Sequence, residues 1–270
     1  MTTAENPAVE AVIRYVVPGE KAIFYPADRE RSYWPGVDYR VQIESMRPRV
    51  SELALERNGF VLVREPTKVQ NFYDADEVKR VYYPEIFDLV KRLNGAAKVI
   101  AFGEITRSDA RQTGEGRLPA YGAHVDYGDI TVRQVAREIL GEEADRWLSM
   151  RYVLMNLWRP IKPVYRTPLA LCDASTVVRS DLNDSEVRGG LGDPNRATLY
   201  GFNLAHSPRH RWYYAPRMQP DEVLAFKLFD SDSSRVQFTG HTAFDDPTAA
   251  PDAPARESIE IRTISFIPAA

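Results

Sequence analysis

Short apolar runs, several of them alternating with polar residues, recur along most of the chain. Before residue 48 these runs are AVIRYVV, KAIFYPA and YRVQIES, and FVLVREP follows soon after. From residue 98 onward come KVIAFGEI, YVLMNLWRPI, PLALCDA, ATLYGFNLA, RWYYAP, EVLAFKLFDS and SIEIRTISFI. Turn-rich segments such as RGGLGDPN and FDDPTAAPDAPA separate the later runs. Many short strands bounded by turn signals predict a β-sandwich or barrel.

Apolar spacing of the helical type is found in three segments. The first spans Arg49 to Asn58 and ends before a glycine. In the second, Asp74 is a candidate N-cap, and Pro84 divides the pattern into two pieces that end at Asn94. The third runs from Thr131 to about Met150. The sequence therefore predicts a few helices beside a β-rich core.

A glycine-rich stretch lies within residues 176 to 196. No helical pattern follows Gly189, Gly190 and Gly192, so they predict a flexible loop rather than a phosphate cradle. A long loop in a compact domain is often functional, and this segment is a candidate lid. The chain shows no internal repeat and no sharp change of composition, which indicates one domain.

Composition and charge narrow the class of partner. The 270 residues carry a formal net charge of -3, so neither nucleic acid nor an anionic membrane is expected as a partner. No stretch approaches the ~20 apolar residues of a membrane span, and the N-terminus lacks a signal-peptide pattern. The single cysteine, Cys172, fits a reducing compartment. We expect a cytoplasmic protein that binds a small molecule, with a homodimer left open.

The segment YGAHVDYGD contains the most informative polar pair. In an extended strand, residues i and i+2 point to the same side, so His124 and Asp126 would share one point. A bare H-x-D pattern is more often chance than a metal site. His241 lies 117 residues further on, after a β-like run, and is the best candidate for a third ligand. Two histidines and one carboxylate with open positions describe a non-heme Fe(II) oxygenase site.

The other two histidines, His206 and His210, have the i,i+4 spacing of a helical metal pair. Pro208 lies between them and argues against a helix. We expect them to be surface or loop histidines, or at most substrate contacts.

The last predicted strand supplies candidate cations for an anionic cosubstrate. Arg256, Ser258 and Arg262 share parity, so all three side chains can face inward. A guanidinium binds a carboxylate through two hydrogen bonds, and a nearby serine can donate another. Glu260 has the same parity and would then need a partner. The alternative is a charged edge strand with solvated arginines, and spacing alone does not decide between the two.

Several blocks taken together resemble one known family. HVDY, NLWRPI, PLALCDAS, HRWYYAPRMQPDEVLAFKLFDS, HTAFDDP and RESIEIR resemble the hydroxylase/desaturase family of Fe(II)/2-oxoglutarate-dependent oxygenases of secondary metabolism, the group of cephem-methoxylation components and meroterpenoid endoperoxidases. The resemblance covers roughly residues 85 to 267. It implies a mainly β fold, a double-stranded β-helix (jelly roll, cupin-like) with flanking N-terminal and inserted α-helices. A single domain would span residues 1–270, with an N-terminal α/β elaboration over 1–100 and the jelly-roll core over about 100–267.

Carried over residue by residue, the resemblance makes His124, Asp126 and His241 the iron ligands and the catalytic centre. It implies Fe(II), 2-oxoglutarate and O2 as cofactor and cosubstrates. The implied activity is that of a dioxygenase, which hydroxylates or desaturates a small-molecule natural-product intermediate through an Fe(IV)-oxo species.

The same resemblance bears on cosubstrate binding. The R-x-S pattern favours Arg256, with Ser258, as the partner of the 2-oxoglutarate carboxylate, and Arg262 remains the alternative. Gly240 stands where a bulkier residue is expected, and its small size would widen the pocket or loosen the strand.

Other residues are weaker candidates for the substrate pocket. Core packing is the competing role for Trp158, and a structural salt bridge is the competing role for Arg159. Lys227 is either a buried cation near the cosubstrate or a charge at the rim. The pocket candidates are Tyr127, Asn156, Trp158, Arg159, Arg211 and Tyr213.

Two other functions compete with an oxygenase. One is a cupin-type metal enzyme that does not use 2-oxoglutarate, and the other is a non-enzymatic small-molecule binding module. A methyltransferase is disfavoured because the chain lacks a glycine-rich strand–turn–helix start for an adenosyl cofactor.

Overall fold

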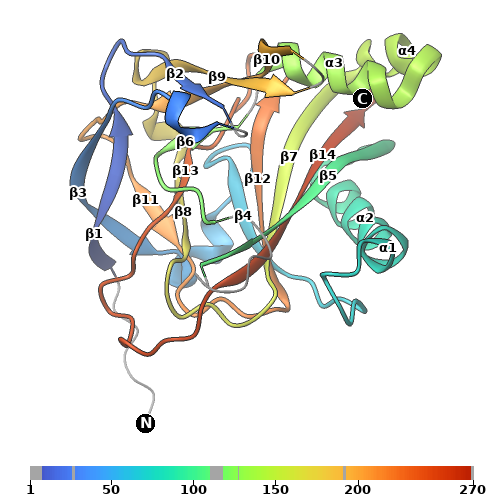
Figure 1. The fold of residues 1–270 in the computed structure, drawn as a ribbon. Coiled ribbons are helices and arrows are strands. Elements are labelled where there is room, and N and C mark those ends of the chain that lie inside the picture. The colour runs from blue at the N-terminus through green and yellow to red at the C-terminus, as the bar shows by residue number, and fades with distance from the viewer. Residues whose placement is uncertain (1–7, 26–27, 110–117, 127, 191–192, 269–270) are drawn as a thin grey trace.

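Two β-sheets face each other and enclose much of the core of the protein (Figure 1). The computed structural model describes residues 8–25, 28–109, 118–126, 128–190 and 193–268. Strands that are far apart in the sequence pair side by side, mostly in antiparallel register. The predicted mainly β class is therefore confirmed.

The sheets differ in size. In the described part of the chain the larger sheet has nine strands, in the order β1 (Ala8–Val16), β3 (Gly36–Ser45), β11 (Trp212–Tyr214), β8 (Leu169–Cys172), β13 (His241–Ala243), β6 (His124–Val125), β10 (Asp193–Leu204), β9 (Leu182–Gly190) and β2 (Ala22–Phe24). The smaller sheet has the order β4 (Phe60–Arg64), β12 (Glu222–Asp230), β7 (Arg151–Pro160), β14 (Glu257–Ile267) and β5 (Lys98–Ser108).

Helices pack outside and at one end of the sheets (Figure 1). They are α1 (Ala75–Glu77), the π-helical turn η3 (Val78–Tyr82), α2 (Tyr83–Asn94), α3 (Asp129–Leu140) and α4 (Ala144–Leu148). Short 3₁₀ turns are η1 (Arg29–Arg31), η2 (Arg47–Glu52), η4 (Gly141–Glu143), η5 (Ala174–Thr176) and η6 (Arg179–Asp181). None of the helices in the described ranges is long and apolar enough to cross a membrane.

The strand β14 lies inside the smaller sheet, between β7 and β5, and is buried on both faces. Ile259 and Ile261 pack on the outer side with the apolar face of α2. Ile264 and Phe266 point into the core between the sheets. An edge strand with solvated arginines, one alternative from the sequence, is therefore wrong. Residues two apart on a strand face the same side, so this arrangement is consistent with the predicted inward direction of four polar residues: Arg256, Ser258, Glu260 and Arg262.

The predicted boundaries of the α1–α2 segment are confirmed. The Asp74 side chain accepts hydrogen bonds from the backbone N–H groups of Asp76 and Glu77, which caps the helix N-terminus. Pro84 lies in the first turn of α2, as expected for a residue without an N–H. Gly95 adopts φ 74° and ends the helix. The two predicted pieces are joined by the π-helical turn rather than by a break.

Two local predictions are wrong. The expected helix over Arg49–Asn58 is instead the 3₁₀ turn η2, which ends at Glu52 and has no buried residue to anchor a longer helix. The expected flexible loop within residues 176–196 contains η6 and the strand β9, which pairs with both β10 and β2. Gly189 has φ 83° within that strand, and the ladder between β9 and β10 shows register shifts nearby. Gly192 lies outside the described residues.

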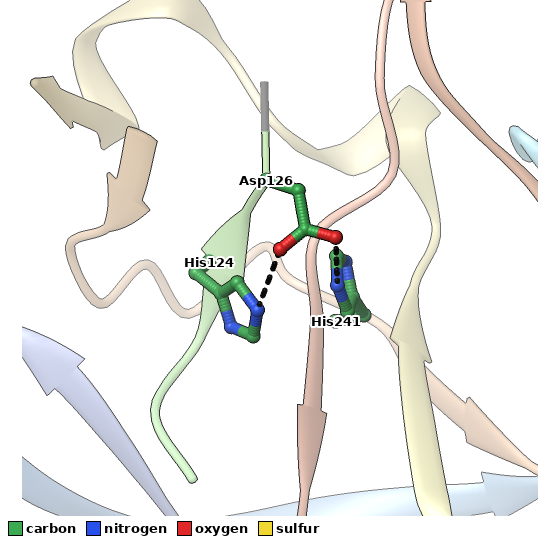
Figure 2. A group of neighbouring side chains, drawn as sticks. All are labelled: His124, Asp126 and His241. Carbon is green, nitrogen blue, oxygen red and sulfur yellow. Dashed lines mark ion pairs between the residues drawn. The ribbon is translucent and has the colours of Figure 1, made fainter. Parts of the chain in front are cut away.

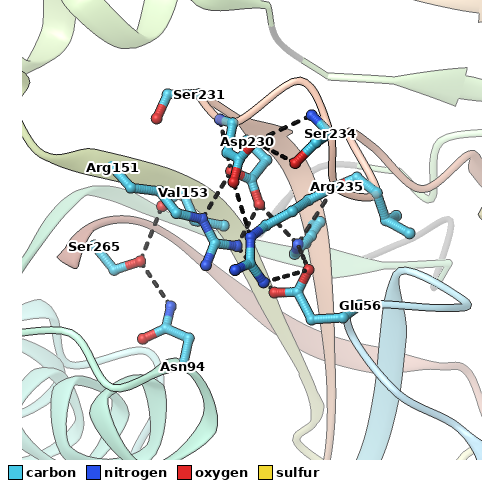
Figure 3. A network of polar contacts seen from close by, with 12 residues as sticks. Glu56, Asn94, Arg151, Val153, Asp230, Ser231, Ser234, Arg235 and Ser265 are labelled. Atoms are coloured by element: carbon cyan, nitrogen blue, oxygen red, sulfur yellow. Dashed lines mark hydrogen bonds and ion pairs between the residues drawn. The ribbon is translucent and has the colours of Figure 1, made fainter. Parts of the chain in front are cut away.

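A buried ion network fixes the end of β12 against β7 (Figure 3). The Asp230 carboxylate has no exposed surface and accepts hydrogen bonds from Arg151 Nη2 at 2.6 Å and Lys227 Nζ at 2.8 Å. Lys227 Nζ also donates to Glu56 Oε2 at 2.8 Å. Lys227 is therefore buried in this structural network, and it is neither a charge at the rim nor part of the cavity lining near Arg256.

We predict that Asp230→Leu lowers the free energy of unfolding by about 3 kcal/mol, because it leaves Lys227 buried without its fully buried counter-ion. Urea denaturation measures this. The matched control is Asp232→Asn, which removes an exposed carboxylate paired with Arg235 and should change stability far less. Equal effects of the two changes would contradict a structural role for the buried network.

Candidate metal centre

Two histidines from distant parts of the chain meet in the larger sheet. β6 and β13 are antiparallel neighbours, and His241 pairs directly with His124. Their ring centroids lie 4.3 Å apart. Asp126 follows β6 two residues after His124, and all three side chains line one cavity with Trp158 of the smaller sheet. Strand pairing therefore creates the cluster that the sequence predicted.

The carboxylate of Asp126 lies between the two imidazoles (Figure 2). His124 Nε2 is 3.3 Å from Asp126 Oδ1, and His241 Nε2 is 3.7 Å from Asp126 Oδ2. One ligand atom of each residue lies within 4.8 Å of the others. Two ligand atoms that are ~2.1 Å from one metal ion and at right angles to it are about 3.0 Å apart. Small shifts of these side chains would therefore let them bind one ion.

Backbone carbonyls orient both imidazoles. His124 Nδ1 lies 2.7 Å from Gly122 O, and His241 Nδ1 lies 3.2 Å from Thr239 O. A carbonyl oxygen only accepts, so a proton on each Nδ1 donates to it, and Nε2 is the ring nitrogen that faces Asp126. Such a partner on the second ring nitrogen is typical of metal-binding histidines.

Burial and neighbouring charges set the protonation of the three side chains. Burial raises the pKa of Asp126, but Arg262 and then the two histidines outweigh it and hold the pKa well below its usual range. Burial lowers the pKa of His241, and His124 lowers it further. For His124, burial lowers the pKa, but the hydrogen bond and charge of Asp126 raise it above its usual value. An ionised carboxylate and a neutral imidazole are the states in which these groups bind a metal ion.

Two glycines allow the backbone to pass close to the candidate metal-binding residues. A Cβ on Gly201 of β10 would lie 2.5 Å from Val125 O and 2.6 Å from Asp126 O, which are backbone atoms. A Cβ on Gly240 would instead meet the side chain of Leu204 at 2.7 Å. Gly240 therefore makes room for a core leucine, rather than widening the pocket as the sequence suggested.

We predict that Gly201→Ala weakens metal binding by roughly 10- to 100-fold, because it displaces the backbone that presents Asp126. Equilibrium dialysis with Co(II) measures the affinity. Gly240→Ala is the control, since rotation of Leu204 can relieve its clash. If both variants bind Co(II) equally well, close packing of β10 on β6 is not what places the carboxylate.

Arg256, just before β14, is buried and only 2% exposed. Its Nε donates to Ser258 Oγ at 3.2 Å and its Nη1 donates to Thr167 O at 2.9 Å. Its guanidinium lies 5.1 Å from the ring centroid of Trp158. Burial, and then the charge of Arg107, lowers the pKa of Arg256 to about 10, so the group stays charged at neutral pH. The nearby carboxylate of Asp109 bonds the backbone N–H of Arg256 rather than its guanidinium.

Arg262 is placed differently. Its Nε lies 3.5 Å from Asp126 Oδ2, and its Nη2 donates to Glu260 Oε1 at 2.7 Å. Arg107 of β5 donates to the same Glu260 oxygen at 3.1 Å. Glu260 therefore has the partner that the sequence analysis required of an inward-facing carboxylate. Arg107 lies in no sequence motif and was not predicted, because only the pairing of β5 with β14 brings it to the site.

The cavity between the two sheets reaches from the metal cluster to Arg256. Its volume is only about 10 Å³, roughly the space of one water molecule. Its side chains must therefore move apart to admit a five-carbon dicarboxylate. The residues that line it are Arg107, Ala120, His124, Asp126, Trp158, Leu169, His241, Ala243, Arg256 and Glu260.

Buried polar groups without partners lie around this cavity. Among the described residues, Trp158 Nε1 and both polar side-chain atoms of Asn156 have no hydrogen-bond partner. Both residues lie on β7 with the same parity, and Asn156 pairs with Arg262 of β14. Asn203 of β10 pairs with His124, and its Oδ1 also lacks a partner in the described part. Asn203 was not predicted, although it is the one amide residue in the otherwise mostly apolar run ATLYGFNLA.

The structure does not bring the remaining pocket candidates to this cavity. Arg159 has the opposite parity on β7, and Tyr82 Oη, Pro220 O and Glu65 O accept its hydrogen bonds. A hydroxyl and two carbonyls thus take the place of the salt bridge expected for Arg159. Arg211 is exposed. Tyr213 packs against Phe60 and accepts a hydrogen bond from Arg49. Tyr127 lies outside the described residues.

The two histidines set aside in the sequence also lie apart from the cavity lining. His206 stacks on Tyr39 with ring centroids 3.9 Å apart. Both histidines lie in the loop between β10 and β11, as expected, but His210 is not at the surface. Its side chain is 1% exposed, and its Nε2 lies 3.2 Å from Asp181 Oδ2.

Comparison with known proteins assigns the chain to a class. Residues 13–266 match a family model described as an Oxidoreductase/YMDC permease-like domain. The hydroxylase/desaturase efuI of Hormonema carpetanum is 33% identical over 250 residues, which are 84% of this chain and 83% of the relative. The alpha-ketoglutarate-dependent dioxygenase phiK of Fungal sp. (strain ATCC 74256) is 32% identical over 97% of both chains. The chain belongs to the hydroxylase/desaturase family of Fe(II)/2-oxoglutarate-dependent oxygenases.

A solved structure agrees with this class. The iron and alpha-ketoglutarate-dependent endoperoxidase NvfI matches with a TM-score of 0.88 at 27% identity, over 97% of this chain and 99% of that chain. The match confirms the predicted double-stranded β-helix. The chain is thus a dioxygenase that uses Fe(II), 2-oxoglutarate and O2 on a small-molecule substrate. The match to the family model begins at residue 13, whereas the resemblance seen in the sequence began near residue 85.

Proposed function

We propose that His124, Asp126 and His241 bind the ferrous ion, through two Nε2 atoms and one carboxylate oxygen. The donor set supports this, since two imidazoles and one carboxylate suit non-heme Fe(II). The carbonyls that hold both Nδ1 atoms support it as well. Three protein ligands would hold the ion and leave coordination positions for the cosubstrate and O2.

The single observation that carries the proposal for the cosubstrate is the state of Arg256. It is a charged, buried guanidinium whose described side-chain partners are a hydroxyl, a carbonyl and an aromatic ring. A buried cation without a counter-ion is costly, and a ligand carboxylate would supply one. We therefore assign one carboxylate of 2-oxoglutarate to Arg256 with Ser258. Arg262 is the weaker candidate because it already contacts Asp126 and Glu260.

The chain's own side chains contribute to the reaction by orienting the substrate and by excluding water from the site. When bound, iron, 2-oxoglutarate and O2 together supply the oxidising power that breaks a C–H bond of the substrate. Trp158 and Leu169 line the cavity with apolar surface that excludes bulk solvent. Within the described residues, the amide group of Asn156 and the amide oxygen of Asn203 have no partner and can hydrogen-bond a ligand. We propose that these groups orient a natural-product intermediate for hydroxylation or desaturation, in line with the names of the relatives.

A turnover experiment tests the proposal. The metal-free protein is mixed with 2-oxoglutarate and O2, with and without Fe(II), and succinate is measured by ¹H NMR. We expect succinate only with Fe(II), and none from His124→Ala. Metal binding without any use of 2-oxoglutarate would instead favour the cupin-type enzyme. Small-molecule binding that needs no metal would favour the non-enzymatic binding module.

We also propose that residues 1–270 work as a single domain. Strands from the first hundred residues support this, because β3 pairs with β11 and β4 pairs with β12. Cytoplasmic location and homodimer formation stay predictions.

A further inference from the structure

Four charged side chains of alternating sign form a row across the interior. The row consists of Arg107 on β5, Glu260 and Arg262 on β14, and Asp126 after β6. The contact distances are 3.1 Å, 2.7 Å and 3.5 Å in that order. The exposed fractions of the four side chains are 14%, 8%, 10% and 15%, so water and salt screen these charges only weakly.

The register of the smaller sheet builds this row. Glu260 and Arg262 are two residues apart on β14 and face the same side. Arg107 pairs with Ser258, one inward position before Glu260. A single oxygen, Glu260 Oε1, therefore accepts hydrogen bonds from both arginines. On its other edge, Arg262 Nε lies 3.5 Å from Asp126 Oδ2, which is an ion-pair contact rather than a hydrogen bond.

Asp126 has two carboxylate oxygens with different surroundings. Oδ1 lies 3.3 Å from His124 Nε2, whereas Oδ2 lies 3.5 Å from Arg262 Nε and 3.7 Å from His241 Nε2. A carboxylate can bind a metal ion through one oxygen or through both. Binding through both would use a coordination position that the cosubstrate needs. A fixed cation at Oδ2 competes with the metal ion for that oxygen.

We propose that Arg262 is a positioning residue that restrains Asp126 to one-oxygen coordination, with Glu260 and Arg107 as its anchors. This proposal rests on the proposed metal site. Arg256, just before β14, and Arg262, within β14, then have separate tasks. Arg256 offers its charge to the cosubstrate, whereas Arg262 holds a metal ligand in place. Their different partners in the structure are the basis for this division.

Co(II) spectroscopy tests the proposal without turnover, because the visible spectrum of Co(II) reports its coordination. The variants are Arg262→Met, Arg262→Lys and the control Arg256→Met. We expect Arg262→Met to bind Co(II) with an altered spectrum before any cosubstrate is added, and to bind 2-oxoglutarate roughly 10- to 100-fold more weakly. Arg262→Lys should restore both properties in part. Arg256→Met should keep the wild-type Co(II) spectrum and lose only 2-oxoglutarate binding.

Each other outcome has a defined meaning. A wild-type Co(II) spectrum and unchanged 2-oxoglutarate affinity in Arg262→Met would overturn the proposal. A wild-type spectrum with lost 2-oxoglutarate binding would make Arg262 a direct cosubstrate ligand and also overturn it. If Arg262→Met does not fold, Glu260→Gln replaces it, and a smaller change in the same direction is expected; an unchanged spectrum there would overturn the proposal. Absence of Co(II) binding by the wild-type protein would instead refute the proposed metal site.

Discussion

An Asp126→Ala variant is expected to lose metal binding and at least about 10³-fold of its 2-oxoglutarate turnover. The substitution removes the only carboxylate of the triad and leaves the Arg262 cation facing the metal position. Two unit charges ~4 Å apart repel by about 4 kcal/mol at an effective dielectric of 20, which corresponds to roughly 10³-fold. Loss of the ligand itself adds to this cost. Bound iron and succinate formation are the two quantities to measure.

The matched control for this variant is Asp145→Ala. Asp145 is a carboxylate with an 89% exposed side chain, and its contact with Arg137 is long at 3.8 Å. Its removal should leave iron content and turnover unchanged. Full iron content in Asp126→Ala would show that the metal binds elsewhere.

An Arg256→Met variant is expected to bind 2-oxoglutarate about 10²- to 10³-fold more weakly while it retains iron. Each hydrogen bond to a charged group contributes about 1.5–3 kcal/mol, and a guanidinium makes two to a carboxylate. Methionine has a similar length and keeps the contact with Trp158, so the fold should tolerate it. Calorimetric titration of 2-oxoglutarate into the metal-loaded protein under anaerobic conditions measures the loss.

Arg159→Met is the control for Arg256→Met. Both arginines are buried, but Arg159 bonds Tyr82 and backbone carbonyls on the opposite side of β7. Its loss should lower stability and leave the 2-oxoglutarate affinity unchanged. If the two variants bind 2-oxoglutarate equally well, Arg256 is not the cosubstrate partner.

The clustering of His124, Asp126 and His241 could be predicted from the sequence because it depends on strand parity. A strand places residues i and i+2 on one side, which is enough to bring His124 and Asp126 together. His241 is distant from His124 in the sequence, so it could join the cluster only through folding. The pairing of β13 with β6 makes the two residues neighbours. The inward direction of Arg256 and Arg262 followed from the same parity.

Elements without a strong local pattern were predicted less well. The strand β9 looked like a loop because glycines and charges interrupt it, yet its neighbours β10 and β2 provide the ladder that stabilises it. The segment after Arg47 has helical spacing, but Pro48 opens a turn that buries none of its residues. Strand pairing therefore determined the structure of the first segment, and the lack of buried contacts determined that of the second.

Residues that act through contacts across the sheets were the hardest to find. Arg107 and Asn203 stand alone in their strands and belong to no motif. Register places Arg107 beside Glu260, and it places Asn203 beside His124. Their roles therefore depend on pairings between strands that are distant in the sequence.

The most direct test of this account is an anomalous-difference map at the iron edge, from crystals grown anaerobically with Fe(II) and 2-oxoglutarate. The account predicts one iron peak within bonding distance of His124 Nε2, His241 Nε2 and one oxygen of Asp126. It also predicts a cosubstrate carboxylate at the Arg256 guanidinium. An iron peak elsewhere, or no peak between these three side chains, would contradict it.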